Sequence, residues 1–287
     1  MRIAVTGVTG RVGRALADHL GRSYEILELP RSRWDLTDPD LAENTAALDF
    51  DLLLHPAAMT SVDACERDPA IAEAVHIEGT RRLLEGCGGR PMLYFSTDYV
   101  LDGAEEGLKP EDAAVSPAGV YGTTKAAAER LVLEAGSTVM RVSWVFGPEK
   151  PSFIDMIARQ AVSGGELEAI DDKFSLPCFT TDLALWVKCW ISAGGPAGLF
   201  HACNSGPPVS WHGMAEVVVR ILAEDGRLAS LPSVRRLRLE EMEAFVAPRP
   251  RHTAMATDRL SALLGKEPRP WPEALGLYLR GTAGLCR

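Results

Sequence analysis

Residues 3–13 read IAVTGVTGRVG, an apolar run followed directly by glycines at every third position. The run Arg2–Thr6 predicts a buried β-strand, and the stretch from Val12 to Leu20 has the apolar spacing of an amphipathic helix. A glycine-rich turn between a strand and a helix is the setting in which backbone N–H groups hold a pyrophosphate. We therefore predict that this stretch opens a nucleotide-binding βαβ fold.

Each glycine of the turn has a separate predicted role. Gly7 allows the tight turn, Gly10 lets the backbone approach a phosphate, and Gly13 lets the helix pack closely on the strand. The N–H groups at the start of the helix, at Arg11 and Val12, would face the phosphates. These residues are predicted cofactor contacts, and the alternative is a glycine-rich turn that binds no ligand.

The first half of the chain continues the alternation of strands and helices. Further apolar runs predict strands at residues 25–29, 52–54, 92–96 and 138–142. Helical patterns lie between them at residues 70–85 and 117–133. Such alternation is typical of a parallel sheet covered on both faces. The predicted fold class is α/β, a Rossmann-type doubly wound parallel sheet with a smaller C-terminal substrate-binding lobe.

The pattern changes after about residue 147, where Gly147, Pro148 and Pro151 break the chain. Helices are predicted beyond this point at residues 153–162, 182–192 and 211–224. We therefore predict an NAD(P)-binding Rossmann domain at residues 1–147. Residues 148–287 are predicted to form a smaller mixed α/β substrate lobe that returns in part to the sheet.

Composition narrows the class of protein. The 287 residues carry a net charge of −9 without a Lys/Arg block, which argues against binding to nucleic acid or an anionic membrane. No apolar run is long enough to span a membrane, and the opening MRIAVTG does not resemble a secretory leader. The six cysteines show no CxxC spacing, so neither a metal site nor disulfides are predicted. We expect a cytoplasmic enzyme.

The end of the second strand bears on the choice of cofactor. It reads YEILELP, so Pro30 and then Arg31 occupy the place where an acid would bond the 2′-hydroxyl of NAD. Glu28 lies two residues too early for this role. An arginine here favours the 2′-phosphate of NADP(H), with NAD(H) as the alternative cofactor, and Asp35 with Leu36 would flank the adenine. The alternative for Arg31 is a charge that solvates the loop.

Several further runs follow the glycine turn: HPAAMTSVD (55–63), YFSTDYVLDG (94–103), YGTTK (121–125), RVSWVFGP (141–148), DDKFSLPCFTTDLA (171–184), LFHACNSG (199–206) and RPRHTAM (249–255). With the glycine turn, their order and distances resemble the extended short-chain dehydrogenase/reductases, and the STDYV run resembles the dTDP-4-dehydrorhamnose reductase branch. The resemblance covers nearly the whole chain.

The resemblance implies a catalytic set of Thr97, Tyr121 and Lys125. Reduction of a ketone builds negative charge on its oxygen, which needs a proton donor, and Tyr121 is implied to be that donor. Its unperturbed pKa is about 10, and Lys125, one helical turn away, is expected to lower it and to bond the nicotinamide ribose. Thr97 would supply a hydroxyl to the same oxygen. The alternative is that Tyr121 and Lys125 are only polar residues on the face of an amphipathic helix, without a catalytic role.

The same resemblance implies further contacts. Ala57, Ala58 and Thr60 would pass beneath the cofactor, where small residues let the backbone approach it. Asp98 and Trp144 would face the sugar, although Trp144 also fits a role in packing between the lobes.

Departures from the family pattern mark other positions. His76 stands where the family often has Asn, and we interpret it as structural rather than as a second acid. Lys173 replaces a Gln, and with Arg249 and Arg251 it is a candidate cation for the substrate diphosphate, the alternative being solvated surface charge. Ala15 replaces the glutamate that some members use in a magnesium-linked dimer, so no metal is predicted, while a homodimer remains a candidate assembly.

These features together predict NADPH-dependent reduction of the 4-keto group of a nucleotide-linked deoxysugar. One alternative is a nucleotide-sugar epimerase or dehydratase of the same fold. Dehydration would favour a Glu directly after Asp98, where this chain has Tyr99. A second alternative is a non-catalytic NADP-binding regulatory subunit. The expected partner is a nucleotide-sugar substrate, with neither nucleic acid nor membrane.

Overall fold

A six-stranded parallel sheet lies at the centre of the computed structural model, which describes residues 1–281. Its spatial order is β2-β1-β3-β4-β5-β10, and every neighbouring pair is parallel. The strands are β1 (Arg2–Thr6), β2 (Glu25–Leu29), β3 (Leu52–His55), β4 (Met92–Thr97), β5 (Thr138–Val142) and β10 (Gly198–His201). The chain order reverses between β1 and β3, which is where open α/β sheets bind ligands at their carboxyl ends. This arrangement confirms the predicted fold class.

The central strands are apolar because both of their faces are covered. All six residues of β4 are buried, and β3 is buried throughout. A strand in this position shows no polar alternation, since neither face meets water. Each buried aliphatic side chain stabilises the fold by about 1.5–3 kcal/mol.

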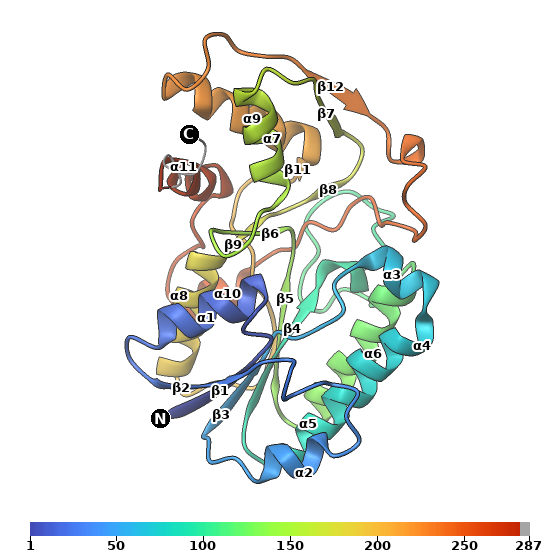
Figure 1. Ribbon diagram of the computed structural model, residues 1–287, viewed down its shortest axis with the longest axis vertical. Coiled ribbons are helices and arrows are strands. Elements are labelled where there is room, and N and C mark those ends of the chain that lie inside the picture. The colour runs from blue at the N-terminus through green and yellow to red at the C-terminus, as the bar shows by residue number, and fades with distance from the viewer. Residues whose placement is uncertain (282–287) are drawn as a thin grey trace.

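Helices cover the two faces of the sheet in separate layers (Figure 1). One layer holds α1 (Arg11–Leu20), α8 (Thr180–Ser192) and α10 (Asp258–Leu264). The opposite layer holds α2 (Leu41–Ala46), α5 (Gly79–Cys87) and α6 (Val120–Glu134). The helix predicted at residues 70–85 is interrupted: α3 (Val62–Arg67) and α4 (Pro69–Glu73) lead through a π-helical turn (Ala74–Glu78) into α5. Such turns are often found at functional sites.

The later half of the chain forms a smaller lobe beyond the carboxyl ends of the strands (Figure 1). Its helices are α7 (Phe153–Val162), α9 (Trp211–Glu224) and α11 (Trp271–Gly281). Short strands pair within it as β6 (Val145–Phe146) with β9 (Cys178–Phe179), β7 (Leu167–Ile170) with β12 (Val234–Leu237), and β8 (Phe174–Ser175) with β11 (Val209–Ser210). Because α8 and β10 also come from this half, a domain boundary at residue 147 stays a prediction.

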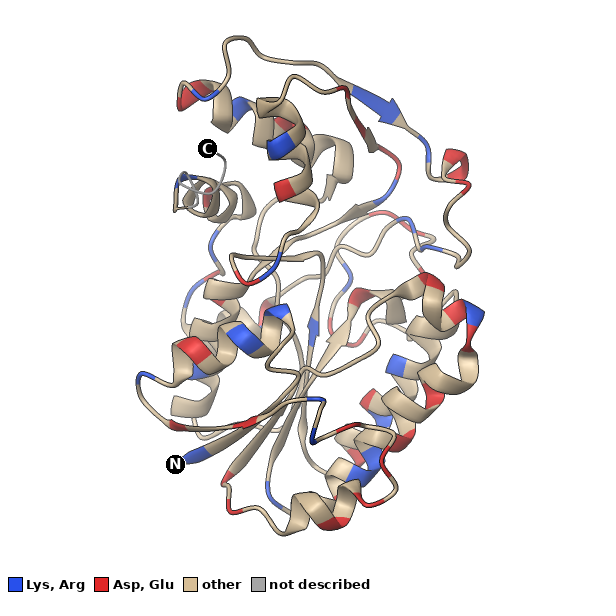
Figure 2. Ribbon diagram, in the orientation of Figure 1, with Lys and Arg blue, Asp and Glu red and all other residues tan. Residues whose placement is uncertain are grey.

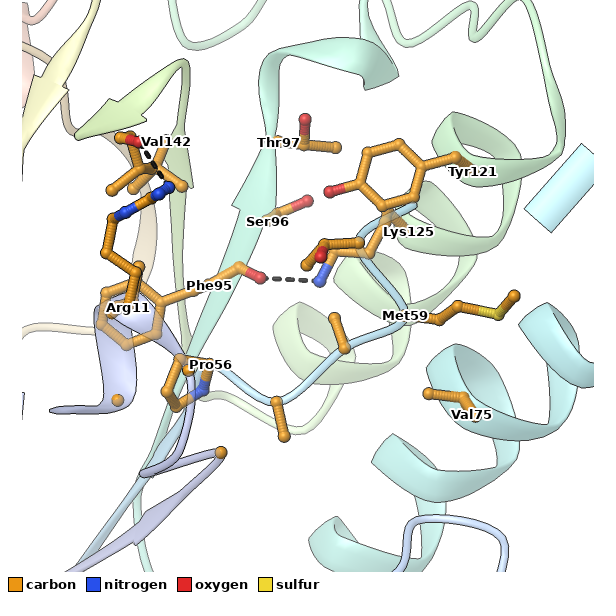
Figure 3. Close-up of a pocket in the computed structure, with 18 of the residues that line it drawn as sticks. Arg11, Pro56, Met59, Val75, Phe95, Ser96, Thr97, Tyr121, Lys125 and Val142 are labelled. Atoms are coloured by element: carbon orange, nitrogen blue, oxygen red, sulfur yellow. Dashed lines mark hydrogen bonds between the residues drawn. The ribbon is translucent and has the colours of Figure 1, made fainter. Parts of the chain in front are cut away.

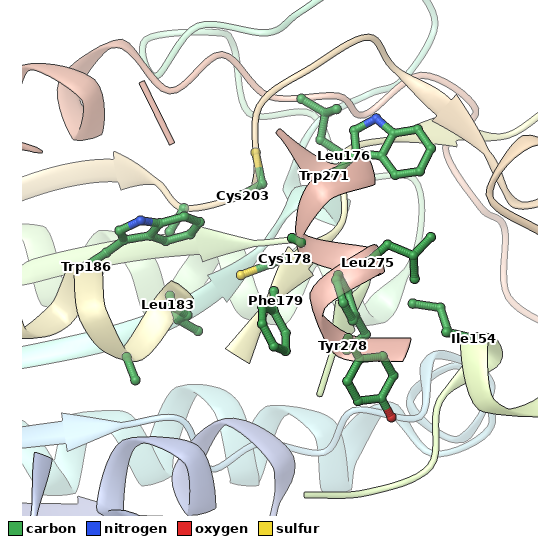
Figure 4. Packing of buried hydrophobic residues seen from close by; sticks show 14 of the residues in the cluster. Ile154, Leu176, Cys178, Phe179, Leu183, Trp186, Cys203, Trp271, Leu275 and Tyr278 are labelled. Atoms are coloured by element: carbon green, nitrogen blue, oxygen red, sulfur yellow. The ribbon is translucent and has the colours of Figure 1, made fainter. Parts of the chain in front are cut away.

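Aromatic packing joins β6, β9 and α11 within the lobe, and Figure 4 shows Phe179 and Tyr278 in this cluster. The rings of Phe146 and Phe179 stack with centroids 5.2 Å apart, and Tyr278 of α11 meets Phe146 edge-on at 5.6 Å. Val145, next to Phe146 in β6, lines the cavity described below.

Charged residues of both signs are interspersed along both halves (Figure 2). Within residues 1–281, no helix is long and apolar enough to cross a membrane.

Candidate active site

The glycine turn between β1 and α1 is as tight as its sequence predicts. Gly7 has φ +61°, and a Cβ there would lie 2.9 Å from the Cα of Ala57. A Cβ on Gly13 would lie 2.2 Å from the carbonyl oxygen of Gly7, so only glycine lets the helix start this close to the turn. The Gly10 N–H donates to the Gly7 carbonyl at 2.8 Å. This cradle leaves backbone room for a phosphate at the start of α1 and so fits a dinucleotide.

A cavity of about 810 Å³ extends from this turn along the carboxyl ends of β1, β3 and β4. All the predicted cofactor residues line it: Gly7, Gly10, Arg11, Val12, Gly13, Arg31, Asp35, Leu36, Ala57, Ala58 and Thr60. Thr97, Asp98, Tyr121, Lys125 and Trp144 line its other end. Lys173 and Arg249 are not among its lining residues.

Tyr121 and Lys125 lie one turn apart near the start of α6 and face the end of β4 (Figure 3). The Tyr121 hydroxyl points toward the strand end that carries Ser96 and Thr97. The Lys125 ammonium is buried, donates to the Phe95 carbonyl at 2.7 Å, and lies 4.0 Å from the centre of the Tyr94 ring. The structure thus brings the predicted catalytic side chains to one end of the cavity.

Burial controls the protonation of this pair. Burial raises the pKa of Tyr121 above its ordinary value, an effect opposed by a hydrogen bond with Thr97. Burial lowers the pKa of Lys125 to about 7, against the pull of Glu129. The expected lowering of the Tyr121 pKa by Lys125 is therefore not seen, because the loss of water disfavours the phenolate and raises this pKa. A raised pKa keeps the phenol protonated, which is the form a proton donor needs.

Thr97 is already hydrogen-bonded in this site. Its hydroxyl accepts from the Tyr99 N–H at 3.1 Å and donates to Asp98 at 3.2 Å. The Asp98 carboxylate is buried and also accepts from the hydroxyls of Ser175 and Thr253. To donate to a substrate oxygen, Thr97 must turn its hydroxyl away from Asp98.

His76 lies on the π-helical turn and supports the site from behind. Its ring contacts the Thr124 hydroxyl at 2.8 Å and the Met59 N–H at 3.1 Å, and it meets the ring of Tyr121 edge-on at 5.8 Å. Burial lowers its pKa to about 3, with Lys125 acting in the same direction, so the imidazole is neutral. This geometry favours the structural interpretation over a second acid.

Trp144 has an unusual backbone. Its φ of 42° is the one positive value among the non-glycine residues of 1–281. Its indole N–H has no hydrogen-bond partner within that range, and its ring meets Trp211 edge-on at 5.6 Å. The same side chain therefore lines the cavity and packs within the lobe.

Two of the three candidate cations for a diphosphate, Lys173 and Arg249, lie behind the cavity wall. Lys173 is fully buried, donates to the Pro250 carbonyl at 2.7 Å and lies 4.7 Å from the centre of the Tyr99 ring. Burial lowers its pKa to about 8, against the attraction of Asp98. Arg249 forms an ion pair with Asp63 at 2.7 Å. Direct contact between either cation and a substrate stays a prediction.

The side chain of Arg11 turns away from the glycine turn. Its guanidinium donates to the carbonyls of Val145, Lys150 and Pro151 at 2.8, 3.1 and 2.7 Å. Its side chain thus holds the start of the lobe, and only its backbone N–H remains available at the helix start.

Arg31 lies at the end of the cavity away from Tyr121 and Lys125, where it follows β2 at the edge of the sheet. Its side chain is 83% exposed and pairs with Asp35 at 3.3 Å, so it is free to meet a phosphate at the rim. Trp34, Met59, Val75, Ser96 and Lys150 also line the cavity but were not predicted. Trp34, Met59 and Ser96 adjoin predicted residues in the chain, which is a usable signal. No local pattern marks Val75 or Lys150.

Residues 1–281 contain no group of three or more His, Cys, Asp or Glu side chains that could hold a metal ion. The site as described contains hydroxyl, phenol and ammonium groups beside a phosphate cradle. That combination suits proton transfer to a substrate whose electrons come from a bound dinucleotide.

The fold and this cavity define a dinucleotide-binding protein of the Rossmann class, in its extended short-chain dehydrogenase/reductase form. A family model described as the RmlD substrate binding domain matches residues 1–283, and the chain belongs to this family. This membership confirms the resemblance seen in the sequence.

Named relatives are similar along their whole length. The chain is 33% identical to a dTDP-4-dehydrorhamnose reductase of Mycobacterium tuberculosis over 294 residues, covering 98% of this chain and 93% of that protein. A crystal structure of a dTDP-4-dehydrorhamnose reductase from Clostridium acetobutylicum has a TM-score of 0.89 at 26% identity, covering 99% of this chain and all of that one. Another, from Bacillus anthracis and in complex with NADP, shares the fold with a TM-score of 0.88 at 24% identity over 98% and 99% of the two chains.

Proposed function

We propose that this protein catalyses NADPH-dependent reduction of the 4-keto group of a dTDP-linked deoxysugar, as a dTDP-4-dehydrorhamnose reductase. The observation that carries the proposal is the convergence of Thr97, Tyr121 and Lys125 at one end of a cavity whose other end is the glycine turn. Family membership and the named relatives support the substrate class. The exposed Arg31, in the place of an acid, supports NADPH over NADH.

NADPH, when bound along this cavity, supplies the hydride. The chain's own residues then manage the proton and the charge. The protonated phenol of Tyr121 donates its proton to the oxygen of the reduced carbonyl, and the ammonium of Lys125 stabilises the phenolate that remains. Thr97 holds the same oxygen once its hydroxyl leaves Asp98. Desolvation strengthens these interactions, because Thr97 and Lys125 are buried.

The direct test is incubation of the purified protein with NADPH and dTDP-4-dehydrorhamnose while the absorbance of the reduced nicotinamide is followed. We expect Tyr121→Phe to bind NADPH normally, by fluorescence titration, while kcat falls by roughly 100-fold or more, the usual effect of losing a positioned proton donor. The control is Tyr24→Phe, which removes a hydroxyl outside the cavity. A Tyr121→Phe enzyme with near wild-type kcat would refute the assignment of the donor. A wild type that binds NADPH but reduces no 4-keto sugar would favour the regulatory alternative.

We also propose that the protein acts in the cytoplasm, where nucleotide sugars and NADPH are expected to meet, and that it forms a homodimer. Cell fractionation tests the first statement. Light scattering of the purified protein tests the second, and a mass equal to one chain would refute it.

A further inference from the structure

A segment without helix or strand crosses from the lobe back to the sheet-bearing half, and we call residues 242–250 the strap. In Figure 1 the strap is the orange stretch that descends from the region of β12 toward α3. Irregular backbone of this kind needs specific contacts to be held in one conformation. Four of its hydrogen bonds go to one carboxylate, and Lys173 binds the Pro250 carbonyl at its end.

Asp63 is that carboxylate, and it lies in the first turn of α3. It accepts the backbone N–H groups of Val246 and Ala247 at 2.9 and 3.0 Å. It also accepts hydrogen bonds from both terminal nitrogens of Arg249, at 3.1 and 2.7 Å. The guanidinium holds the pKa of Asp63 well below its usual range, aided by the two N–H groups, so the carboxylate remains charged at any pH where the enzyme works.

The guanidinium of Arg249 is buried in this contact and bonded on several sides. Its side chain is 7% exposed, and its Nη1 also donates to the Ala247 carbonyl at 2.7 Å. Its guanidinium stacks 3.6 Å from the centre of the Phe245 ring. A guanidinium bound bidentately to one carboxylate has little left to offer a diphosphate. Arg249 is therefore placed to hold the strap rather than to bind substrate.

Aromatic contacts connect the strap to the cavity wall. Phe245 meets Trp211 edge-on at 6.5 Å, and Trp211 meets Trp144 at 5.6 Å. Trp144 lines the cavity in a left-handed backbone conformation. Such a conformation costs about 1–3 kcal/mol for a non-glycine residue and persists only where the surroundings enforce it. The strap provides part of that enforcement.

The same ion pair reaches the opposite wall of the cavity. Asp63 directly follows Thr60, Ser61 and Val62, of which Thr60 and Val62 line the cavity. The Asp63–Arg249 pair thus ties the wall expected to lie beneath the cofactor to the wall expected to face the sugar.

We propose that Asp63 and Arg249 form a latch that holds the strap and thereby positions Trp144 for the sugar nucleotide, without either residue touching the substrate. This inference rests on the proposed reductase function. Both are positioning residues, so their loss should weaken sugar-nucleotide binding while leaving the hydride and proton transfers intact.

The test compares Asp63→Asn, Arg249→Met and the double variant. Asparagine keeps an acceptor for the two N–H groups but loses the charge, and methionine keeps an apolar stem over Phe245. We expect each single variant to raise the KM for the sugar nucleotide by about tenfold, and the double variant to do no worse, since coupled residues are not additive. The kcat and the KM for NADPH should stay near wild type. The control is Arg269→Met, which breaks the 3.3 Å ion pair with Asp182 of α8, outside the cavity, and should leave every KM unchanged.

Hydrogen exchange of the strap gives a readout that does not depend on turnover. We expect faster exchange at Val246 and Ala247 in both single variants, and Arg249→Lys, which keeps the cation, to restore part of the wild-type protection and KM. A raised KM for the sugar nucleotide in Arg249→Met but not in Asp63→Asn would mean that Arg249 binds substrate, and it would overturn the latch. An unchanged KM in both single variants would also overturn it. So would a double variant whose effect on KM is the sum of the two single effects. If the wild type reduces no sugar nucleotide, the proposed function fails by itself. Unchanged exchange in the variants would then overturn the latch independently.

Discussion

At the scale of single residues, the site depends on ionisable groups that the fold removes from water. Lys125 is 2% exposed, yet it must be an ammonium to stabilise a phenolate. Its pKa of about 7 reflects burial, which Glu129 and Cys65 oppose only in part. The protein therefore tolerates an unfavourable charge at the position where its proposed chemistry needs one.

This cost predicts a dependence of stability on pH. Between pH 7 and about 10.5 the unfolded chain keeps the Lys125 proton while the folded protein releases it, so the contribution of Lys125 to stability rises with pH. Below pH 7 the full cost of burying the ammonium is present. We expect Lys125→Met to be more stable than the wild type at pH 7, with the gap narrowing toward pH 10 at a slope of up to about 1.4 kcal/mol per pH unit.

Urea unfolding of both proteins at pH 7, 8, 9 and 10 checks this expectation. Tyr24→Phe, measured in parallel, should show no change in slope relative to the wild type. A constant gap between Lys125→Met and the wild type would show that Lys125 does not titrate in this window.

At the scale of elements, the turn between β1 and α1 links the stability of the fold to the binding of a phosphate. Gly13 lies inside α1, where glycine is normally unfavourable, and it is tolerated because the Gly7 carbonyl lies where a side chain would be. The close approach that excludes a Cβ also brings the start of α1 up to the turn. One packing constraint thus serves both stability and phosphate binding.

Gly13→Ala should therefore damage both properties. A Cβ 2.2 Å from the Gly7 oxygen forces α1 away from the turn, and we expect a loss of about 1–3 kcal/mol in the free energy of unfolding. The Kd for NADPH, by fluorescence titration, should rise by about tenfold or more. Gly165→Ala is a suitable control, because the nearest atom to its Cβ would lie at an ordinary 3.5 Å. An unchanged Kd in Gly13→Ala would contradict the role given to this close contact.

At the scale of the whole molecule, the side chain of Arg11 joins the glycine turn to the lobe. It starts at α1 and ends on three carbonyls of the segment 145–151. That segment also lines the cavity through Val145, Lys150 and Pro151. The relative placement of the two halves is therefore set beside the cofactor site.

We expect Arg11→Met to lower the free energy of unfolding by about 1.5–3 kcal/mol, the usual worth of hydrogen bonds from a charged group. The Kd for NADPH should also rise, because the 145–151 wall loses its support. Urea unfolding and fluorescence titration measure the two effects, with a matching substitution at the exposed Arg22 as the control. A variant as stable as the wild type, with unchanged affinity, would show that Arg11 does not join the halves.

Local patterns in the sequence predicted much of this architecture. Strands β1, β2 and β5 and helices α7 and α9 have the predicted bounds, because apolar periodicity records which face of each element is buried. The predicted cofactor residues, Thr97, Tyr121 and Lys125 all line one cavity, since each lies in a short motif at the carboxyl end of a strand or at the start of a helix.

The side chains whose placement was not foreseen have partners far away in the chain. Arg249 bonds Asp63, 186 residues earlier, and Lys173 bonds Pro250, 77 residues later. The guanidinium of Arg11 bonds Val145, 134 residues later. No local pattern records such a pairing, because it arises only when the strap and the lobe pack against the sheet.

The sequence by itself therefore determined the parallel sheet, the phosphate turn and the spacing of Tyr121 and Lys125, all of which depend on neighbours within a few residues. Tertiary structure alone decided which cations remain free, how Trp144 is held and what the protonation state of Lys125 is. Those properties depend on burial and on long-range hydrogen bonds, and both are set by how distant segments meet.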